Sequence, residues 1–296
     1  MFNFLKNKKI KMEGDGVFVL FDIGGTKTRV AASRDGKTIG DIKTAETPKD
    51  FGKAINLIKK MKDEVSLGEH VKAVALGVPG ILSRDRRRIF RLTNLSGWDG
   101  IDFSTELEKI INAPVYIEND ATLVGLGEAV NGAGRGYGIV AYITVSTGVG
   151  GVRIVGGSID RKTFGFEPGW QIINFADLIK NENNGYLGSY ISGRAIEEKF
   201  GKYPIDVSDT KILDELALEL AVGLYNVILL WSPDAVILGG SMITGVNPIP
   251  LDKVEEKLRE LLTTIFPEIP VIKKAILGDK GGLYGALEFV SKKYGN

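Results

Sequence analysis

The sequence predicts an α/β protein built from two related halves. Two glycine-tipped hairpins, at residues 17–30 and 139–152, are the first reason. Each has an apolar, β-rich run, a tip of glycine and small hydroxyl residues, and a second β-branched run, a pattern typical of a strand, a tight turn and a returning strand. The second reason is that strands come first and helices follow in both halves, which indicates a duplicated fold.

The tips of both hairpins are suited to holding an anion. The first tip reads Gly24-Gly25-Thr26 and the second reads Ser146-Thr147-Gly148. Glycine lets backbone N–H groups come close to an anion, and the hydroxyl groups add hydrogen-bond donors. One such loop is weak evidence for a phosphate site. Two loops in separate halves suggest that the protein grips a polyphosphate from both sides.

The first half follows the hydrophobic periodicity of strands and amphipathic helices. Residues 71–78 are almost wholly apolar and predict a buried strand, whereas residues 81–91 alternate and are charged, which predicts an exposed hairpin. Residues 1–15 have the composition of a frayed tail. The predicted elements are strands at 17–23, 26–32 and 37–43, a helix at about 48–65, a strand at 71–78, the hairpin at 81–91, a helix at about 104–112 capped by Ser104, a strand at 115–118, and a helix from 119–121 to about 131.

The second half repeats this arrangement after the hairpin at 139–152. Residues 156–190 are rich in loop-forming residues and show little periodicity, so no regular element is predicted there. A strong amphipathic pattern at 209–230 predicts the longest helix. The predicted elements are helices at about 193–200 and 209–230, a strand from 234 that runs into a glycine turn at Gly239 and Gly240, a helix at about 252–264, a strand at 271–276, and a helix at about 282–292.

Composition excludes several classes of function. The 296 residues are enough for two lobes with hydrophobic cores, and 38 Lys and Arg balance 37 Asp and Glu, so no broad basic field predicts nucleic-acid binding. The absence of cysteine rules out disulfides and cysteine-ligated zinc. No apolar run is long enough for a signal peptide or a membrane-spanning helix. We therefore expect a soluble cytoplasmic protein with no membrane partner.

The chain resembles the ROK family of sugar kinases, part of the actin-like ATPase superfamily, over about residues 17–290. The resemblance rests on motifs that occur in family order: Asp22-Ile-Gly-Gly-Thr-Lys27, Gly77-Val-Pro-Gly80, Asn94-Leu-Ser-Gly-Trp98, Glu118-Asn-Asp-Ala121, Ser146-Thr-Gly-Val-Gly-Gly151, Ser192-Gly-Arg-Ala-Ile196, Leu238-Gly-Gly-Ser241 and Leu277-Gly-Asp-Lys-Gly-Gly282. It implies two actin-like, ribonuclease H-like lobes with a cleft between them. We expect an N-terminal lobe at 16–118, on which a C-terminal helix at about 283–296 packs, and a C-terminal lobe at 119–282.

The same resemblance implies a catalytic base at Asp120, in Glu118-Asn-Asp-Ala121. A carboxylate in the cleft can accept the proton of a sugar hydroxyl as that hydroxyl attacks the γ-phosphorus of ATP. Asn119 is expected to hydrogen-bond sugar hydroxyls, because its amide both donates and accepts. The alternative for both residues is that they only cap the helix that begins there. The other residues expected to contact the sugar are Gly80, Glu167 and Trp170.

The same resemblance implies that residues of both hairpins, and of the turn at Gly239 and Gly240, bind the nucleotide and its magnesium ion. Asp22 is expected to hold Mg²⁺ through water, although it has no obvious partner in the sequence and an ordinary turn aspartate is the alternative. Gly239 and Gly240 are expected to lie against the adenosine, and a plain strand-to-helix turn would also explain them. The residues expected to approach the phosphates are Gly24, Gly25, Thr26, Lys27, Thr147 and Gly148.

The chain departs from the family pattern in one region. The family's Glu-x-Gly-His segment reads Glu167-Pro-Gly-Trp170, and the loop that usually holds zinc reads 174–185 without cysteine. A second sugar-binding Glu of the family aligns with Gly188. The resemblance therefore implies no zinc and two missing sugar contacts, so that Trp170 either stacks on a sugar face or packs in the core.

We expect an ATP- and Mg²⁺-dependent kinase that phosphorylates a hexose or a hexose derivative, and a homodimer. The alternative is a sugar-sensing regulator or degenerate kinase of the same family. The family's repressors carry an N-terminal helix-turn-helix domain, for which about 16 residues before the first strand are too few. The sugar, the accepting hydroxyl and the nucleotide preference stay open. Arg84-Asp-Arg-Arg-Arg88 reads as a solvated face rather than an anion site.

Overall fold

The computed structural model describes residues 16–90, 92 and 95–294. The predicted tail at 1–15, Arg91 at the end of the predicted hairpin, Asn94 of the Asn94–Trp98 motif and the last two residues of the C-terminal helix lie outside the described residues. The rest divides into two compact units. Unit 1 holds the described residues up to Val124 together with those from Gly282 onward, and unit 2 holds Gly125–Gly281.

Unit 1 contains a five-stranded sheet. Its strands β1 (Val17–Ile23), β2 (Lys27–Ser33), β3 (Lys43–Glu46), β4 (Val71–Val78) and β7 (Val115–Asn119) lie in the order β3-β2-β1-β4-β7. The pairs β1–β2 and β2–β3 are antiparallel, whereas β1–β4 and β4–β7 are parallel. A separate small hairpin pairs β5 (Ile81–Leu82) with β6 (Ile89–Phe90), as the sequence predicts.

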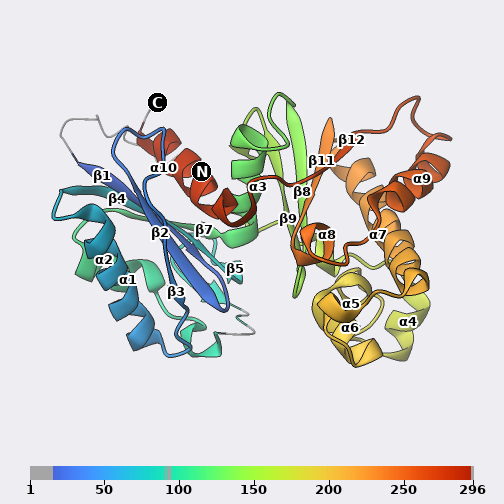
Figure 1. The fold of residues 1–296 in the computed structure, drawn as a ribbon, viewed down its shortest axis with the longest axis horizontal. Helices are drawn as coiled ribbons and strands as arrows, with labels where there is room; N and C mark the ends of the chain where they lie inside the picture. The colour runs from blue at the N-terminus through green and yellow to red at the C-terminus, as the bar shows by residue number, and fades with distance from the viewer. Residues whose placement is uncertain (1–15, 91, 93–94, 295–296) are drawn as a thin grey trace, which may run out of the picture. The chain divides into compact units, whose positions relative to one another are not determined.

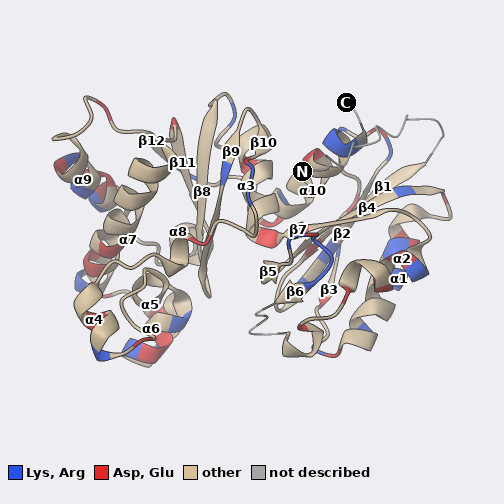
Figure 2. Ribbon diagram, turned by 180° about the vertical axis from the view of Figure 1, so that it is seen from behind, with Lys and Arg blue, Asp and Glu red and all other residues tan. Residues whose placement is uncertain are grey.

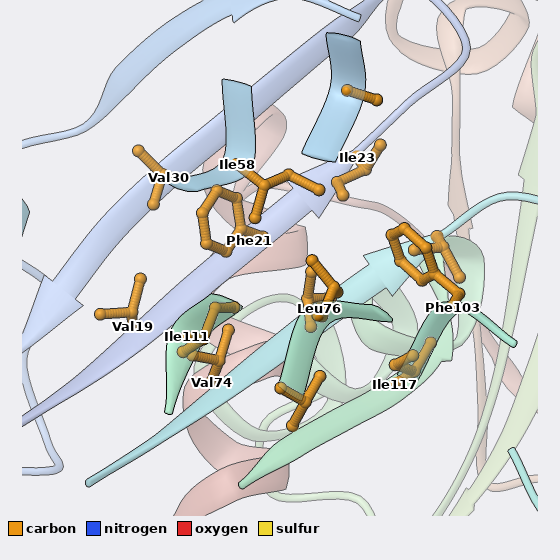
Figure 3. Close-up of a cluster of buried hydrophobic side chains, with 14 of the residues drawn as sticks. Val19, Phe21, Ile23, Val30, Ile58, Val74, Leu76, Phe103, Ile111 and Ile117 are labelled. Carbon is orange, nitrogen blue, oxygen red and sulfur yellow. The ribbon is translucent and has the colours of Figure 1, made fainter. Parts of the chain in front are cut away.

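Helices cover both faces of this sheet, because both faces of its central strand are apolar. Val19 and Phe21 share a buried cluster with residues of α1 (Phe51–Ser66) and α2 (Phe103–Ile111) (Figure 3). Phe18 and Leu20 belong to a second cluster with residues of α10 (Gly281–Tyr294) and the start of α3 (Asp120–Asn131). Figure 1 shows α1 and α2 on one side of the sheet and the red helix α10 on the other. A short 3₁₀ helix, η1 (Ser96–Trp98), precedes α2.

Unit 2 repeats the strand pattern of unit 1. Its sheet has the order β10-β9-β8-β11-β12, in which β8–β9 and β9–β10 are antiparallel and β8–β11 and β11–β12 are parallel. Each strand thus corresponds to one of unit 1, so the duplicated α/β fold is confirmed. The strands are β8 (Ile139–Val145), β9 (Val149–Val155), β10 (Ser158–Ile159), β11 (Ala235–Gly239) and β12 (Val271–Lys274).

The core of unit 2 lies between its sheet and two long helices. Ile143 and Val145 of β8 share one buried cluster with Leu220 and Leu224 of α7 (Thr210–Trp231) and Leu258 of α9 (Leu251–Leu262). Burying these side chains contributes about 25 cal/mol per Å² of apolar surface. The remaining elements are η2 (Pro168–Trp170), α4 (Phe175–Lys180), α5 (Gly188–Ile191), α6 (Gly193–Phe200), η3 (Pro204–Asp206), α8 (Ser241–Thr244) and η4 (Gly278–Lys280).

Charges of both signs alternate on the surface helices. Along α9, three ion pairs join side chains three or four residues apart, Lys253 with Glu256, Lys257 with Glu260 and Arg259 with Glu255, and blue and red segments mix there in Figure 2. Such exposed pairs stabilise a helix only slightly. Within the described ranges, no helix has the length and apolar character needed to span a bilayer.

Two local predictions are wrong. The strand predicted at 37–43 lies at Lys43–Glu46 instead, because Asp35 accepts hydrogen bonds from the N–H groups of Lys37 and Thr38 and holds a turn there. The helix predicted at about 104–112 is present as Phe103–Ile111, but the predicted cap at Ser104 is wrong: Asp102 caps the helix, and its side chain accepts the N–H of Thr105. In the segment 156–190, where no regular element is predicted, the structure has four short ones.

Candidate active site

Polar residues gather where the parallel strands of unit 1 end. Asp22 of β1 is in register with Gly77 of β4, and Gly77 is in register with Glu118 of β7. A Cβ atom on Gly77 would lie 3.3 Å from the Cα atom of Asp120 and 3.8 Å from Oδ1 of Asp22. The two acidic residues singled out from the sequence therefore border the same glycine. Ligands of open α/β sheets bind at the carboxyl ends of such strands.

The carboxylate of Asp22 is held between Arg29 and Gly282. Its carboxylate forms an ion pair with Arg29 of β2, with 3.6 Å between Oδ2 and Nη1, a partner that is not obvious from the sequence. Strand pairing explains the contact, because Asp22 and Arg29 are opposite each other in the β1–β2 register. A Cβ atom on Gly282 would lie only 2.5 Å from Cγ of Asp22, so the carboxylate occupies the space that a side chain at 282 would need.

The first glycine tip is closed by backbone hydrogen bonds and by a threonine from the next loop. The N–H of Gly24 donates to the carbonyl of Lys27 at 2.8 Å. Thr47 donates its hydroxyl to the Gly24 carbonyl at 2.8 Å and its N–H to the Thr26 carbonyl at 2.9 Å. Thr26 and Lys27 are exposed at the tip, beside the partly exposed Gly25. No motif in the sequence marks Thr47, because its contacts come from chain pairing rather than from spacing.

Asn119 forms one hydrogen bond from each end of its side-chain amide. Its Oδ1 accepts the N–H of Thr122 at 3.0 Å, which is the hydrogen bond of a helix N-cap. Its Nδ2 donates to the carbonyl of Gly80 at 3.1 Å. Gly80 itself requires glycine, because its φ is +93° and a Cβ atom there would lie 2.8 Å from the Phe90 carbonyl oxygen. The capping role that the sequence left open for Asn119 is confirmed.

Asp120 has a different environment. Its Oδ1 accepts the N–H of Ala121 at 2.8 Å, and within the described part of the chain no hydrogen-bond partner reaches Oδ2. Burial raises the pKa of Asp120 above its ordinary value of 3.8, and the hydrogen bond from Ala121 opposes that shift. Since Asn119 caps α3, the carboxylate of Asp120 keeps one oxygen available for another proton donor.

Unit 2 places the second glycine tip beside the turn after β11. Ser146 and Ser241 join the two segments through their hydroxyl oxygens, which are 3.1 Å apart. A Cβ atom on Gly240, where φ is +88°, would lie 2.2 Å from the carbonyl oxygen of Val145, so the turn needs glycine to fit against β8. The predicted phosphate-binding residues Thr147 and Gly148 and the predicted adenosine-binding residues Gly239 and Gly240 are therefore neighbours. The geometry of the turn is enough to explain the glycine at 240, so a plain strand-to-helix turn remains an alternative to adenosine binding.

Glu167 and Trp170 lie at the two ends of η2. The N–H of Trp170 donates to the Glu167 carbonyl at 3.0 Å. The side chain of Trp170 is 56% exposed and contacts Tyr186 edge to face, with ring centroids 5.3 Å apart, so the core-packing alternative for Trp170 is wrong. Gly188 lies directly behind this turn, since a Cβ atom there would be 3.2 Å from the Gly169 carbonyl oxygen.

Hydrogen bonds to Asp177 hold the loop at 174–185, which corresponds to the zinc-binding loop of the family. Its carboxylate accepts the hydroxyl of Tyr190 at 2.6 Å and the amide of Asn174 at 2.9 Å, and Lys180 donates to its other oxygen at 3.3 Å. The Tyr190 hydroxyl holds the pKa of Asp177 below its ordinary value, while burial and Asp177 together raise the pKa of Tyr190 to about 12. Among the described residues no group of three His, Asp or Glu side chains is arranged to hold a metal.

Comparisons with known proteins find sugar kinases among the relatives of this chain. The glucokinase of Thermotoga maritima is 27% identical over an alignment 310 positions long, and the alignment covers 93% of this chain and 97% of that protein. The crystal structure of a ROK family glucokinase from Streptomyces griseus, in complex with glucose and AMPPNP, has a TM-score of 0.75 and 25% identity, covering 93% of this chain and 99% of that one.

A second kind of relative is a regulator. The xylose repressor of Bacillus subtilis is 29% identical over 202 residues, which cover 62% of this chain and 52% of the repressor. The fold is thus the actin-like fold expected from the motifs, and it is shared by kinases and repressors. Residues 19–293 match the ROK family, and the chain belongs to that family.

Proposed function

We propose that the protein is an ATP-dependent kinase that phosphorylates a hydroxyl of a hexose or hexose derivative. The observation that carries the proposal is Asp120, a carboxylate at the start of α3 with a raised pKa and one oxygen to which no described residue hydrogen-bonds. The similarity to glucokinases over nearly the whole chain supports the same class of reaction. A sugar sensor has no need of a carboxylate prepared to accept a proton.

In the proposed reaction, Asp120 accepts the proton of the sugar hydroxyl while the hydroxyl oxygen bonds to the γ-phosphorus and ADP leaves. The raised pKa makes the carboxylate a better base than an exposed aspartate. It also sets the acid limit of activity, because only the ionised carboxylate accepts a proton. Activity should therefore fall as the pH drops through a value above 3.8, the ordinary pKa of an aspartate.

In this proposal, unit 1 binds the magnesium ion of the nucleotide complex. Mg²⁺ usually takes one or two carboxylates from the protein and completes its shell with water and phosphate oxygens. Asp22 fits this role, since the space left by Gly282 fixes its carboxylate where β1 ends. When bound, the ion neutralises phosphate charge. Lys27 at the exposed tip and the N–H group of Gly25 then hold the phosphates, because the N–H of Gly24 already donates to the Lys27 carbonyl within the tip.

In unit 2, Thr147 and Gly148 are assigned to the phosphates, and Gly239 and Gly240 to the adenosine. Glu167 of unit 2 is assigned to the sugar. In unit 1, Asn119 and Gly80 are assigned to the sugar. Trp170 is exposed, and its aromatic ring is assigned to stacking on a sugar.

The second candidate is a non-catalytic sugar sensor, which the similarity to the xylose repressor favours. One experiment separates the two. Purified protein is incubated with ATP, Mg²⁺ and each of a panel of sugars that includes glucose, mannose, fructose, allose and N-acetylated amino sugars, and ADP release is measured. A kinase releases ADP with at least one sugar and forms the corresponding sugar phosphate. A sensor binds a sugar in calorimetry but releases no ADP with any of them.

A further inference from the structure

The arginine-rich hairpin β5–β6 is more tightly built than a solvated loop. Ser83 organises its tip: its N–H donates to the Arg88 carbonyl at 2.9 Å, and its hydroxyl oxygen accepts the N–H groups of Arg87 at 3.2 Å and Arg88 at 3.0 Å. Arg86 has a φ of +61°, the left-handed conformation that is unfavourable for a residue with a Cβ atom. The tip therefore holds Arg86 in one strained backbone conformation.

The arginines of this tip differ sharply in their contacts. Arg87 forms ion pairs with Asp102 and Glu108 at 3.5 and 3.6 Å. Arg86 forms an ion pair with Glu118 of β7, with 3.8 Å between Nη1 and Oε1. Arg84 is exposed, and no described residue pairs with it. The prediction of a solvated face thus holds for Arg84 and is wrong for Arg86 and Arg87.

Glu118 is the unusual member of the Arg86 pair. Its side chain is only 6% exposed, and that of Arg86 is 24% exposed. A buried carboxylate is costly unless a cation and hydrogen-bond donors compensate it. The same Oε1 atom that faces Arg86 also accepts the N–H of Asn119 at 2.8 Å. One oxygen therefore links the hairpin arginine to the backbone of the residue before Asp120.

The base of the hairpin also contacts Asn119, through the side chain of that residue. Nδ2 of Asn119 donates to the carbonyl of Gly80, which lies between β4 and β5, and the space above Gly80 is filled by Phe90 and Ile89 of β6. Asn119 is therefore held at its backbone through Glu118 and Arg86, and at its side chain through Gly80. All of these contacts lie within unit 1.

We infer that Arg86 is a positioning residue for the sugar: through Glu118 it fixes the backbone at Asn119, and so sets how well a sugar hydroxyl is bound there and presented to Asp120. This inference rests on the proposed kinase function and deepens it by adding a residue that none of the family motifs contains. Arg86 does not touch the reacting atoms. Its loss should act on the sugar and leave the nucleotide unaffected.

The test compares Arg86→Met with Arg84→Met, a matched change two residues away on the same tip. We expect Arg86→Met to raise the KM for the best sugar about tenfold, because the buried Glu118 carboxylate loses its arginine partner. The KM for ATP should stay within about twofold. Arg84→Met should match the native protein in both constants.

Two further variants keep the test decisive if Arg86→Met folds poorly. Arg86→Lys restores the cation and should return most of the sugar affinity. Adding Glu118→Gln to Arg86→Met removes the buried negative charge that has lost its arginine but keeps an oxygen for the Asn119 N–H, so it should also recover sugar affinity.

The inference is wrong if the native protein phosphorylates a sugar and Arg86→Met and Arg84→Met have the same sugar KM. It is also wrong if Arg86→Met raises the KM for ATP as much as that for the sugar, or if neither Arg86→Lys nor the added Glu118→Gln recovers sugar affinity. If the native protein releases ADP with no sugar at all, the proposed function itself fails and the inference fails with it.

Discussion

Replacing Gly282 by alanine tests whether the position of Asp22 matters for the nucleotide. The added Cβ atom would lie 2.5 Å from Cγ, 2.7 Å from Oδ1 and 2.9 Å from Oδ2 of Asp22. Ordinary contacts of this kind need about 3.4 Å or more, so the carboxylate has to withdraw by roughly 0.5–0.9 Å. A misplacement of about 1 Å in a catalytic arrangement costs on the order of a hundredfold in rate.

We therefore expect Gly282→Ala to lower kcat/KM for ATP by about thirty- to a hundredfold, equivalent to about 2–3 kcal/mol of transition-state stabilisation. The assay is coupled ADP release over a range of ATP and Mg²⁺ concentrations, with the sugar KM measured in parallel. More Mg²⁺ should be needed for half-maximal rate, while the sugar KM should change little.

Gly52→Ala is the matched control, because Gly52 is also the second residue of its helix. A Cβ atom there would meet only Oδ1 of Asp50, at 3.4 Å, an ordinary contact. Alanine favours helix by about 1 kcal/mol over glycine in both places, so a loss of helix stability does not explain a difference between the variants. If Gly282→Ala kept ATP-dependent activity within about threefold of the control, Asp22 would not hold the magnesium ion.

Three other predictions concern unit 2. Tyr190→Phe removes the hydroxyl that donates to Asp177. Amide hydrogen exchange in the loop at 174–185 should therefore become faster, and the sugar KM should rise. Unchanged exchange would show that this hydrogen bond does not hold the loop. Combining Trp170→His with Gly188→Glu should improve kcat/KM for glucose by about tenfold, less than two full hydrogen bonds would give, since a side chain at 188 needs a small shift of the backbone behind it; a submillimolar glucose KM in the native protein would contradict this. Burial raises the pKa of Glu219 from 4.5 to about 7, so its carboxylate lowers the stability of the fold progressively as the pH rises from 4.5 to about 7, above which the penalty is constant. Glu219→Gln should therefore raise Tm by about 1–2 °C at pH 8 and not at pH 4.5; an equal shift at both pH values would refute the linkage.

The parts of the fold that follow from local pattern could be predicted from the sequence. Both hairpins, the strand at 71–78 and the helix that begins at Asp120 are marked by periodicity or by glycine. The strand at Lys43–Glu46 could not be placed, because the turn before it depends on how one side chain, that of Asp35, bonds to the backbone. The cap of α2 could not be predicted either, because Asp102 and Ser104 are both good capping residue types. In the structure the cap is Asp102.

The site shows the same division. Motifs identify Asp22, Asn119 and Asp120 because the chain keeps them in short runs. They do not identify Arg29, which meets Asp22 through strand pairing, or Thr47, which closes the glycine tip from another loop. Such partners are set by the register of strands and loops, which no spacing in the sequence expresses.

Asp120→Asn is the measurement that tests the proposed kinase most directly. The amide oxygen of asparagine can still accept the N–H of Ala121, and Asn119 still caps α3, so the fold and the binding of the best sugar, measured by calorimetry, should be retained. The amide cannot accept the proton of the sugar hydroxyl, so kcat at saturating ATP, Mg²⁺ and sugar should fall about a thousandfold or more. Turnover close to that of the native protein, with the same sugar bound, would contradict the assignment of Asp120 as the base.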